Sequence, residues 1–228
     1  MPLRNRVGSA YNSGMCVIDR KQIVGLVLAG GQSRRMGGGD KGLLELGGRT
    51  MLEHVVARLA PQTGRIVLNA NGDPARFQSL HLPVAADTIE GFAGPLAGVL
   101  AGFAWAAANV PEATHVASVS ADAPLLPADL VERLAAAVSR RPTSIALARS
   151  GGELHPVIGL WPVALAGDLE LELRAGVRKV LRWTDKHGTI PVDFPFIEAA
   201  GERIDPFFNA NTPEELDEAR RLLAIVAT

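Results

Sequence analysis

The sequence is short of sulfur, aromatic rings and net charge. One cysteine, Cys16, occurs among 228 residues, so neither an internal disulfide nor a cysteine metal cluster can form, as is usual in a reducing compartment. Aromatic residues make up 5% of the chain, too few for the stacking platforms of single-stranded nucleic-acid binders. The formal net charge is −1, whereas general nucleic-acid binders carry a basic face. We therefore expect no nucleic-acid partner.

Long apolar runs are also missing. No segment reaches the ~18 uninterrupted apolar residues of a membrane helix. Glycine, serine and asparagine interrupt the N-terminal stretch, which lacks the apolar core of a signal peptide. We expect residues 1–22 to form a flexible extension, with Met15 as a rival translation start. The expectation is a soluble, cytoplasmic protein without a membrane partner.

Hydrophobic residues nevertheless make up 47% of the chain, and apolar β-type runs alternate with helical patterns. A capping box at Thr50 and Glu53 marks one helix start. Pro95 and Pro127 stand at the tolerated first turn of two more, and TPEE from Thr212 starts a last helix that ends at about residue 224. Strands are expected at residues 23–29, 65–71, 82–87, 115–122 and 144–149.

This alternation predicts an α/β fold with a mainly parallel sheet and helices on both of its faces. Ligands of such sheets bind at the carboxyl ends of the strands. Residues 151–208 are less regular, with a helical stretch at 177–183 and a short strand in TIPVDF; we expect them to complete the sheet and line part of the cleft. No linker or repeat interrupts residues 23–228, which predicts one domain.

A basic, glycine-rich loop follows the first predicted strand, at residues 30–42 (GGQSRRMGGGDKG). Glycines let backbone N–H groups approach an anion, and Arg34, Arg35 and Lys41 add charged donors. The loop is neither a P-loop, because Gly42 follows the lysine, nor a dinucleotide fingerprint, because the glycine spacing differs. A solvated surface loop is the alternative, but the position directly after a buried strand favours polyphosphate binding.

The stretch LAGGQSRRMGGGDKGLLELGGRTMLEHV resembles the signature of the molybdenum cofactor guanylyltransferases, which are nucleotidyltransferases with a Rossmann-like fold of the nucleotide-diphospho-sugar transferase type. The resemblance extends over residues 23–224. Each short motif is weak alone, but together and in this order they are specific. The others are NAN at 69–71, GPLAG at 94–98, D-x-P at 122–124, HP at 155–156 and N-x-NTPEEL from 209.

The resemblance implies transfer of GMP from GTP to the terminal phosphate of molybdopterin, with or without bound molybdenum, and release of pyrophosphate. The attacking phosphate oxygen is already anionic, so positioning and charge neutralisation should suffice without a general base. Mg²⁺ is the implied cofactor. Molybdenum-insertion proteins and acceptor molybdoenzymes are implied as further partners.

The resemblance also assigns the charged residues. Lys41 matches the lysine that binds the triphosphate and stabilises transition-state charge. Arg35 would hold the β- and γ-phosphates, with Arg34 ranked below it. Asp122 matches the magnesium-binding aspartate, and its place at a strand end favours that role over a turn or cap. Relatives often have cysteine before this aspartate, where this chain has Ala121.

Further positions match nucleotide contacts of the family. Leu28, Ala29 and Gly30 would bind the guanine nucleotide through their backbone groups. Asn69 and Asp87 would make side-chain contacts, with Asp87 accepting from guanine or ribose donors. Asn69 can instead be a turn residue at the strand end, and Asp87 can instead cap the following loop.

Three residues match the acceptor side of the site. Asn209 and Asn211 would face the pterin phosphate and the metal, and His155 would touch the pterin. Asn211 can instead only shape the helix entry before Thr212. His155 can instead be structural, because Leu154 stands where relatives often have a polar residue.

Three other protein classes match the sequence less well. The cytidylyltransferases that act on the same pterin resemble L-A-A-G-x-S in the first loop, where this chain reads L-A-G-G. Sugar-phosphate nucleotidyltransferases resemble G-x-G-T-R and usually carry a C-terminal extension. A non-catalytic nucleotide-binding homologue would not need both Lys41 and Asp122.

Overall fold

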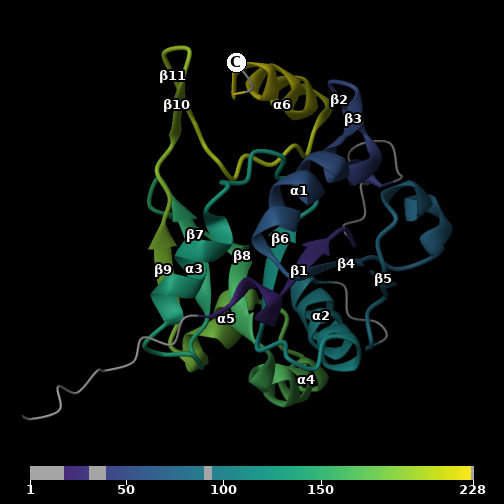
Figure 1. Cartoon of the computed structure of the whole chain (residues 1–228), viewed down its shortest axis with the longest axis vertical. Helices are drawn as coiled ribbons and strands as arrows, with labels where there is room; N and C mark the ends of the chain where they lie inside the picture. Colours follow the sequence, from purple (N-terminus) through teal and green to yellow (C-terminus); the bar gives the residue numbers. More distant parts are fainter. Residues whose placement is uncertain (1–17, 31–39, 90–93, 227–228) are drawn as a thin grey trace, which may run out of the picture.

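The computed structural model describes residues 18–30, 40–89 and 94–226. Seven strands form one sheet in the order β5-β4-β1-β6-β8-β7-β9, with helices packed around it (Figure 1). The strands of this sheet are β1 Ile23–Leu28, β4 Arg65–Asn69, β5 Val84–Ala85, β6 His115–Ser120, β7 Ala146–Ser150, β8 Glu153–Pro162 and β9 Ile190–Asp193. The helices are α1 Met51–Leu59, α2 Pro95–Asn109, α3 Leu130–Val138, α4 Ala166–Arg174, α5 Val180–Thr184 and α6 Pro213–Val226.

The sheet is mainly parallel, which confirms the predicted fold class. Parallel pairs join β1 to β4 and β6, β4 to β5, and β7 to β9. All five predicted strands are present, but the third is reduced to the two residues of β5. The carboxyl ends of β1, β4, β5, β6 and β7 therefore meet at one edge of the sheet.

The exception is β8, which runs antiparallel between β6 and β7. Residues 151–162 were expected to be irregular, and this is a correction. Gly151 and Gly152 both have positive φ, 56° and 90°, the geometry of a two-residue hairpin turn that glycine adopts without strain. The ten residues that follow the turn form β8, which pairs with β7 on one side and with β6 on the other, and His155 thereby lies near the carboxyl-end edge of the sheet.

Helices cover both faces of the sheet, as predicted. On one face α1 and α3 bury Leu52, Leu59 and Leu134 against Val27. On the other face α2 packs against β1, and α2, α4 and α5 bury side chains in one core with Leu26. Successive side chains of β1 therefore enter different cores, as the period of a strand covered on both faces requires.

Helix starts agree with the sequence in part. Thr50 and Glu53 form the predicted capping box of α1. Helix α3 begins at Leu130 rather than at Pro127, because Pro127 belongs to a preceding turn whose carbonyl accepts from the Leu130 N–H. Helix α5 begins three residues later than expected, and α4 occupies a stretch for which no element was predicted.

The C-terminal part of the chain returns to the end of the molecule where the carboxyl ends of the parallel strands lie. Two small hairpins, β2 Glu45–Leu46 with β3 Arg49–Thr50 and β10 Ile197–Ala199 with β11 Glu202–Ile204, lie at the same end of the molecule as α6 (Figure 1). Leu216 and Ala219 of α6 pack with Leu46. This packing places the segment before α6 beside Lys41, whose Nζ bonds to Asn211.

Two predictions concern parts of the chain that the structure leaves out or does not test. The proposed extension falls mostly on residues 1–17, which lie outside the described residues, and the single-domain assignment remains a prediction. None of the helices in the described ranges is long and apolar enough to cross a membrane.

Candidate active site

Backbone contacts tie three strand ends together at the carboxyl edge. The Ala29 N–H donates to the carbonyl oxygen of Asn69 at 2.9 Å, and the Ala121 N–H donates to that of Leu28 at 3.1 Å. These bonds continue the ladders of β1 with β4 and β6 by one residue. The residues that follow the three strands are thereby held in fixed register to one another.

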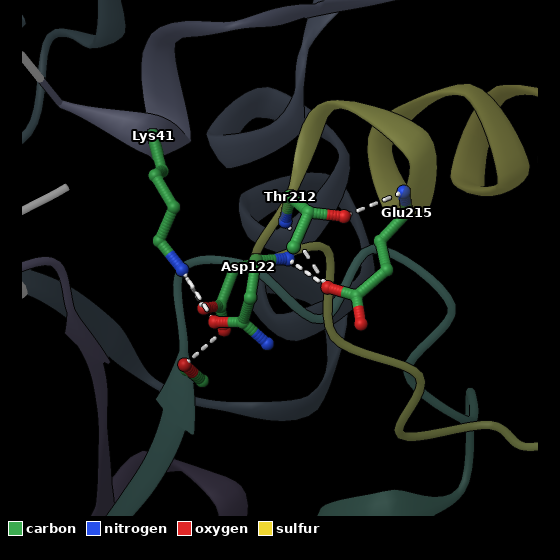
Figure 2. Close-up of polar contacts among 6 residues, drawn as sticks. Lys41, Asp122, Thr212 and Glu215 are labelled. Atoms are coloured by element: carbon green, nitrogen blue, oxygen red, sulfur yellow. Dashed lines mark hydrogen bonds and ion pairs between the residues drawn. The ribbon is translucent and has the colours of Figure 1, made fainter. Parts of the chain in front are cut away.

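Lys41 and Asp122 meet at this edge (Figure 2), and Asn211 joins them through a hydrogen bond to Lys41. The Lys41 Nζ lies 2.9 Å from Asp122 Oδ2 and 2.6 Å from Asn211 Oδ1. The side chains of Lys41 and Asp122 are 17% and 16% exposed, so the ion pair is partly shielded from water while remaining reachable. The Ser120 hydroxyl donates to the other carboxylate oxygen of Asp122. Segments far apart in sequence therefore form one charged cluster.

The entry to α6 holds Asn211 in place. The Glu215 carboxylate accepts from the N–H groups of Asn211 and Thr212 at 2.6 and 3.1 Å, and the Glu215 N–H donates to Thr212 Oγ1 at 3.2 Å. The Ala210 N–H donates to the Asp122 carbonyl at 3.2 Å. The backbone of Asn211 therefore lies at the helix entry, and its side chain reaches Lys41. Its role toward the pterin phosphate and the metal stays a prediction.

The oxygen atoms here suit a divalent cation that is shared with phosphates. No group of three or more histidine, cysteine or acidic side chains that could hold a metal occurs in the described part of the chain. Asp122 offers a carboxylate. The Asn209 Oδ1 is buried and has no partner within the described ranges. Mg²⁺ is usually bound by one or two carboxylates, water and substrate phosphates, so the residues present fit such an ion.

A second cluster forms at the ends of β4 and β5. The buried Asn69 donates from Nδ2 to the Ala85 carbonyl at 3.1 Å and to Asp87 Oδ1 at 3.0 Å. Asn71 donates from Nδ2 to Asp87 Oδ2 at 2.8 Å, and its Oδ1 accepts from the Asp87 N–H at 2.8 Å. Amide groups therefore orient both carboxylate oxygens of Asp87. Asn71, which was not assigned a role from the sequence, holds Asp87 together with the predicted Asn69.

Two glycines border this second cluster. A Cβ at Gly98 would lie 2.4 Å from Asn69 Oδ1 and 2.6 Å from Leu28 Cδ2, whereas a Cβ at Gly30 would lie 3.8 Å from Asn69 Oδ1. Only Gly98 is therefore required by close packing. It lets α2 approach the ends of β1 and β4.

Arg76, which was not predicted, lies between the two clusters. Its Nε lies 2.5 Å from Asp40 Oδ2, next to Lys41. Its terminal nitrogens donate to the carbonyl oxygens of Asn71 at 2.5 Å and Asp73 at 3.2 Å. One guanidinium thus joins the end of the glycine-rich loop to the turn that carries Asn71.

His155 lies in a third group. Its Nε2 is 2.7 Å from Ser150 Oγ, which donates to Asp205 Oδ1 at 2.8 Å. The ring packs against Phe207 with a centroid distance of 4.6 Å. Burial lowers the pKa of His155, and the nearby carboxylates of Asp205 and Glu153 offset this in part. Ser150 and Asp205 were not predicted, because they are 55 residues apart in the sequence and no local pattern indicates their hydrogen bond.

The two arginines of the glycine-rich loop lie outside the described residues. Arg34 and Arg35 fall within residues 31–39. Their assignment to the β- and γ-phosphates stays a prediction. The other predicted residues fall into groups. Lys41, Asp122 and Asn211 form one cluster, and Asn69 and Asp87 form another. Residues 28–30 lie at the end of β1, where Leu28 and Ala29 bond to the ends of β6 and β4.

Known proteins resemble this chain over most of its length. A family model described as MobA-like NTP transferase domain matches residues 25–190. The chain belongs to this family. A molybdenum cofactor guanylyltransferase of Bradyrhizobium sp. (strain ORS 278) is 54% identical over 204 residues, which cover 89% of this chain and 94% of the relative. The resemblance inferred from the sequence motifs is thereby confirmed.

Solved structures extend the likeness to the fold. Molybdopterin-guanine dinucleotide biosynthesis protein A from Archaeoglobus fulgidus matches with a TM-score of 0.67 at 20% identity, over 88% of this chain and 98% of that one. A protein of Mycobacterium tuberculosis H37Rv, solved in complex with manganese, matches with a TM-score of 0.59 at 18% identity, over 88% of this chain and 98% of that one. At such identities the likeness shows the shared fold.

Proposed function

We propose that the protein transfers GMP from GTP to the terminal phosphate of molybdopterin, giving molybdopterin guanine dinucleotide and pyrophosphate. One observation carries the proposal. The Lys41–Asp122–Asn211 cluster stands at the carboxyl edge of the sheet in a chain that is 54% identical to a molybdenum cofactor guanylyltransferase.

The reaction joins two anions, so neutralising charge is the main task of the protein. An oxygen of the pterin phosphate attacks the α-phosphorus of GTP, the new P–O bond forms, and the bond to the β-phosphate breaks. Lys41 supplies a positive charge where negative charge develops. Asp122 and the oxygen of Asn209 would hold a divalent cation, which lowers the charge of the phosphates when bound. No general base is needed, because the nucleophile is already ionised.

The nucleotide base would be read at the second cluster. Asp87 is an acceptor held in place by Asn69 and Asn71, and guanine offers N–H donors on the edge that pairs with cytosine. Backbone groups of residues 28–30 would bind the remainder of the nucleoside. A site that pairs with a specific edge rejects an analogue, because the mismatch leaves buried polar groups unpaired. GTP should therefore be preferred over CTP and ATP.

The acceptor would lie on the other side of Asp122. The segment 205–211 carries Asn209 and Asn211 and bonds to the Asp122 carbonyl through the Ala210 N–H, and His155 packs on Phe207 of the same segment. We assign these residues to the pterin and its phosphate. We also assign Mg²⁺ as the cation because the available ligands are hard oxygens, and we place the enzyme in the cytoplasm with molybdenum-insertion proteins and acceptor molybdoenzymes as partners.

The test is product formation from purified molybdopterin, Mg²⁺ and each of the four nucleoside triphosphates. We expect the dinucleotide and pyrophosphate with GTP. Product from CTP instead would make the protein a cytidylyltransferase. Nucleotide binding without pyrophosphate release would make it a non-catalytic homologue.

A further inference from the structure

Three residues outside the two nucleotide clusters form a chain of hydrogen bonds. Ser150 ends β7, His155 lies at the start of β8, and Asp205 precedes the segment that leads to Asn211. The Ser150 hydroxyl stands between the other two, 2.7 Å from His155 Nε2 and 2.8 Å from Asp205 Oδ1. The order is histidine, serine, carboxylate, so the serine is not activated as in a nucleophilic triad.

The direction of each bond follows from counting protons. Asp205 Oδ1 also accepts the Phe207 N–H at 2.9 Å, and an ionised carboxylate only accepts. The Ser150 hydroxyl has a single proton and donates it to Asp205. Toward His155 the hydroxyl oxygen must then accept, so Nε2 carries a proton. In a neutral imidazole the other nitrogen, Nδ1, is left as an acceptor.

We propose that Ser150 and Asp205 fix His155 as its Nε2–H tautomer, so that Nδ1 accepts an N–H group of the acceptor ring system and does not donate to its phosphate. The inference rests on the proposed function, which supplies a pterin as the acceptor. A reduced pterin carries several ring and amino N–H donors, whereas a phosphate oxygen would need a donor. His155 is a binding residue in this scheme, and Ser150 and Asp205 are positioning residues.

Two further observations agree with a neutral, fixed ring. Burial lowers the pKa of His155, which favours the uncharged form near neutral pH. The Phe207 ring packs against the imidazole at 4.6 Å, and three residues later the Ala210 N–H bonds to the Asp122 carbonyl. The imidazole is therefore connected through one short segment to the predicted reaction centre.

The tautomer can be measured without any substrate. The full-length protein is labelled with ¹⁵N-histidine, and the His155 signals are assigned by their loss in His155→Gln. We expect a protonated Nε2 and an unprotonated Nδ1 at neutral pH. In Ser150→Ala the preference should weaken, in Ser150→Thr it should persist, and in Ser79→Ala, which alters an exposed serine, it should not change. A protonated Nδ1 in the parent protein would overturn the inference.

Steady-state kinetics test whether His155 contacts the pterin. Loss of one hydrogen bond predicts a rise of about tenfold in KM for molybdopterin in Ser150→Ala, with KM for GTP unchanged and recovery in Ser150→Thr. An equal rise in both KM values, or none, would contradict the assignment to the pterin. Absence of pyrophosphate release by the parent protein with every nucleotide would remove the proposed function and the pterin contact together, while the tautomer result stands by itself.

Discussion

Lys41 joins two residues of the candidate site that are distant in sequence, Asp122 and Asn211. Its ammonium group donates to a carboxylate and to an amide oxygen at hydrogen-bond distance. An ammonium has three protons that rotate freely, so it can keep such partners while it turns toward a phosphate. The side chain is 17% exposed, so it is less open to solvent than a lysine of a surface loop.

Replacing Lys41 by alanine should lower kcat for pyrophosphate release by roughly 10²–10³, the cost of removing one charged transition-state contact at comparable sites. The fold should persist, because Ser120 and solvent still reach the Asp122 carboxylate. Kinetics and thermal unfolding of the variant check both statements, with the exposed Lys179→Ala as control. Unchanged turnover would refute the role given to Lys41.

Asp122→Asn should weaken the dependence on divalent cation more than the binding of GTP. The amide keeps the shape of the carboxylate but loses the charge that holds the ion. Titration of activity with Mg²⁺, beside direct GTP binding, separates the two effects, and Asp129→Asn removes an exposed carboxylate as a control. If the magnesium dependence stays that of the parent, the metal site lies elsewhere.

Gly30→Ala tests base selection. The added methyl would stand 3.8 Å from Asn69 Oδ1, an ordinary contact, so the fold should be retained. We expect kcat/KM for GTP to fall by about tenfold relative to that for CTP, because the methyl enters the space assigned to guanine. If the variant keeps the parent's preference for GTP over CTP, base selection depends on Asn69 and Asp87 rather than on Gly30.

At the scale of elements, α2 depends on glycines that face the sheet. A Cβ at Gly98 would meet Asn69 Oδ1 at 2.4 Å, and one at Gly102 would meet Leu26 Cδ2 at 2.7 Å. The helix is apolar almost all round and nine of its residues are buried, so it cannot move outward without opening the core. The GPLAG motif therefore has a packing reason beside any functional one.

Gly98→Ala should destabilise the protein by about 1–3 kcal/mol, as overpacking of a close interface does. It should also displace Asn69 and weaken GTP binding. Urea unfolding and nucleotide titration measure the two effects. Gly167→Ala is the matched control, since a Cβ there meets nothing within 4 Å, and the same substitution should be neutral or stabilise by up to about 1 kcal/mol. Equal stabilities of the two variants would contradict this packing argument.

The elements that the sequence predicted well are those with local signals. The capping box of α1 and the apolar runs of β1 and β6 were placed within about two residues. The hairpin turn at 151–152 also had a signal in its adjacent glycines, but the long strand after it was missed because its partners, β6 and β7, lie on both sides in space. Helix α4 is weakly amphipathic and has no side-chain cap, so nothing local marked it.

At the scale of the whole molecule, the site is an assembly of distant segments. Residues of the predicted site were found through motifs, but Arg76, Ser150 and Asp205 were not, because their importance lies in partners that only the fold brings near. The bond between Lys41 and Asn211 spans 170 residues of sequence. Such contacts follow from sheet order and from the packing of α6, which periodicity alone does not determine.

The fold also buries a histidine, and this predicts how stability depends on pH. His115 is 3% exposed, and burial lowers its pKa although its Nε2 bonds to the Pro142 carbonyl. In the unfolded chain this histidine has an ordinary pKa of about 6.5. As the pH falls below that value, the unfolded chain therefore binds a proton that His115 in the folded chain does not yet bind. Stability is full above that pKa and decreases as the pH falls below it.

We therefore expect the Tm to fall between pH 7.5 and pH 5.5 at constant ionic strength, measured by thermal unfolding. Carboxylates such as Asp193, whose pKa is lowered first by its hydrogen bonds with Arg149, lose their contribution only at more acidic pH. His115→Gln should flatten the fall in part, since the pKa of His155 is lowered too. His81→Asn, which removes an exposed histidine at positive φ, should leave the fall unchanged. A parent-like pH dependence in His115→Gln would show that this buried imidazole does not couple protonation to folding.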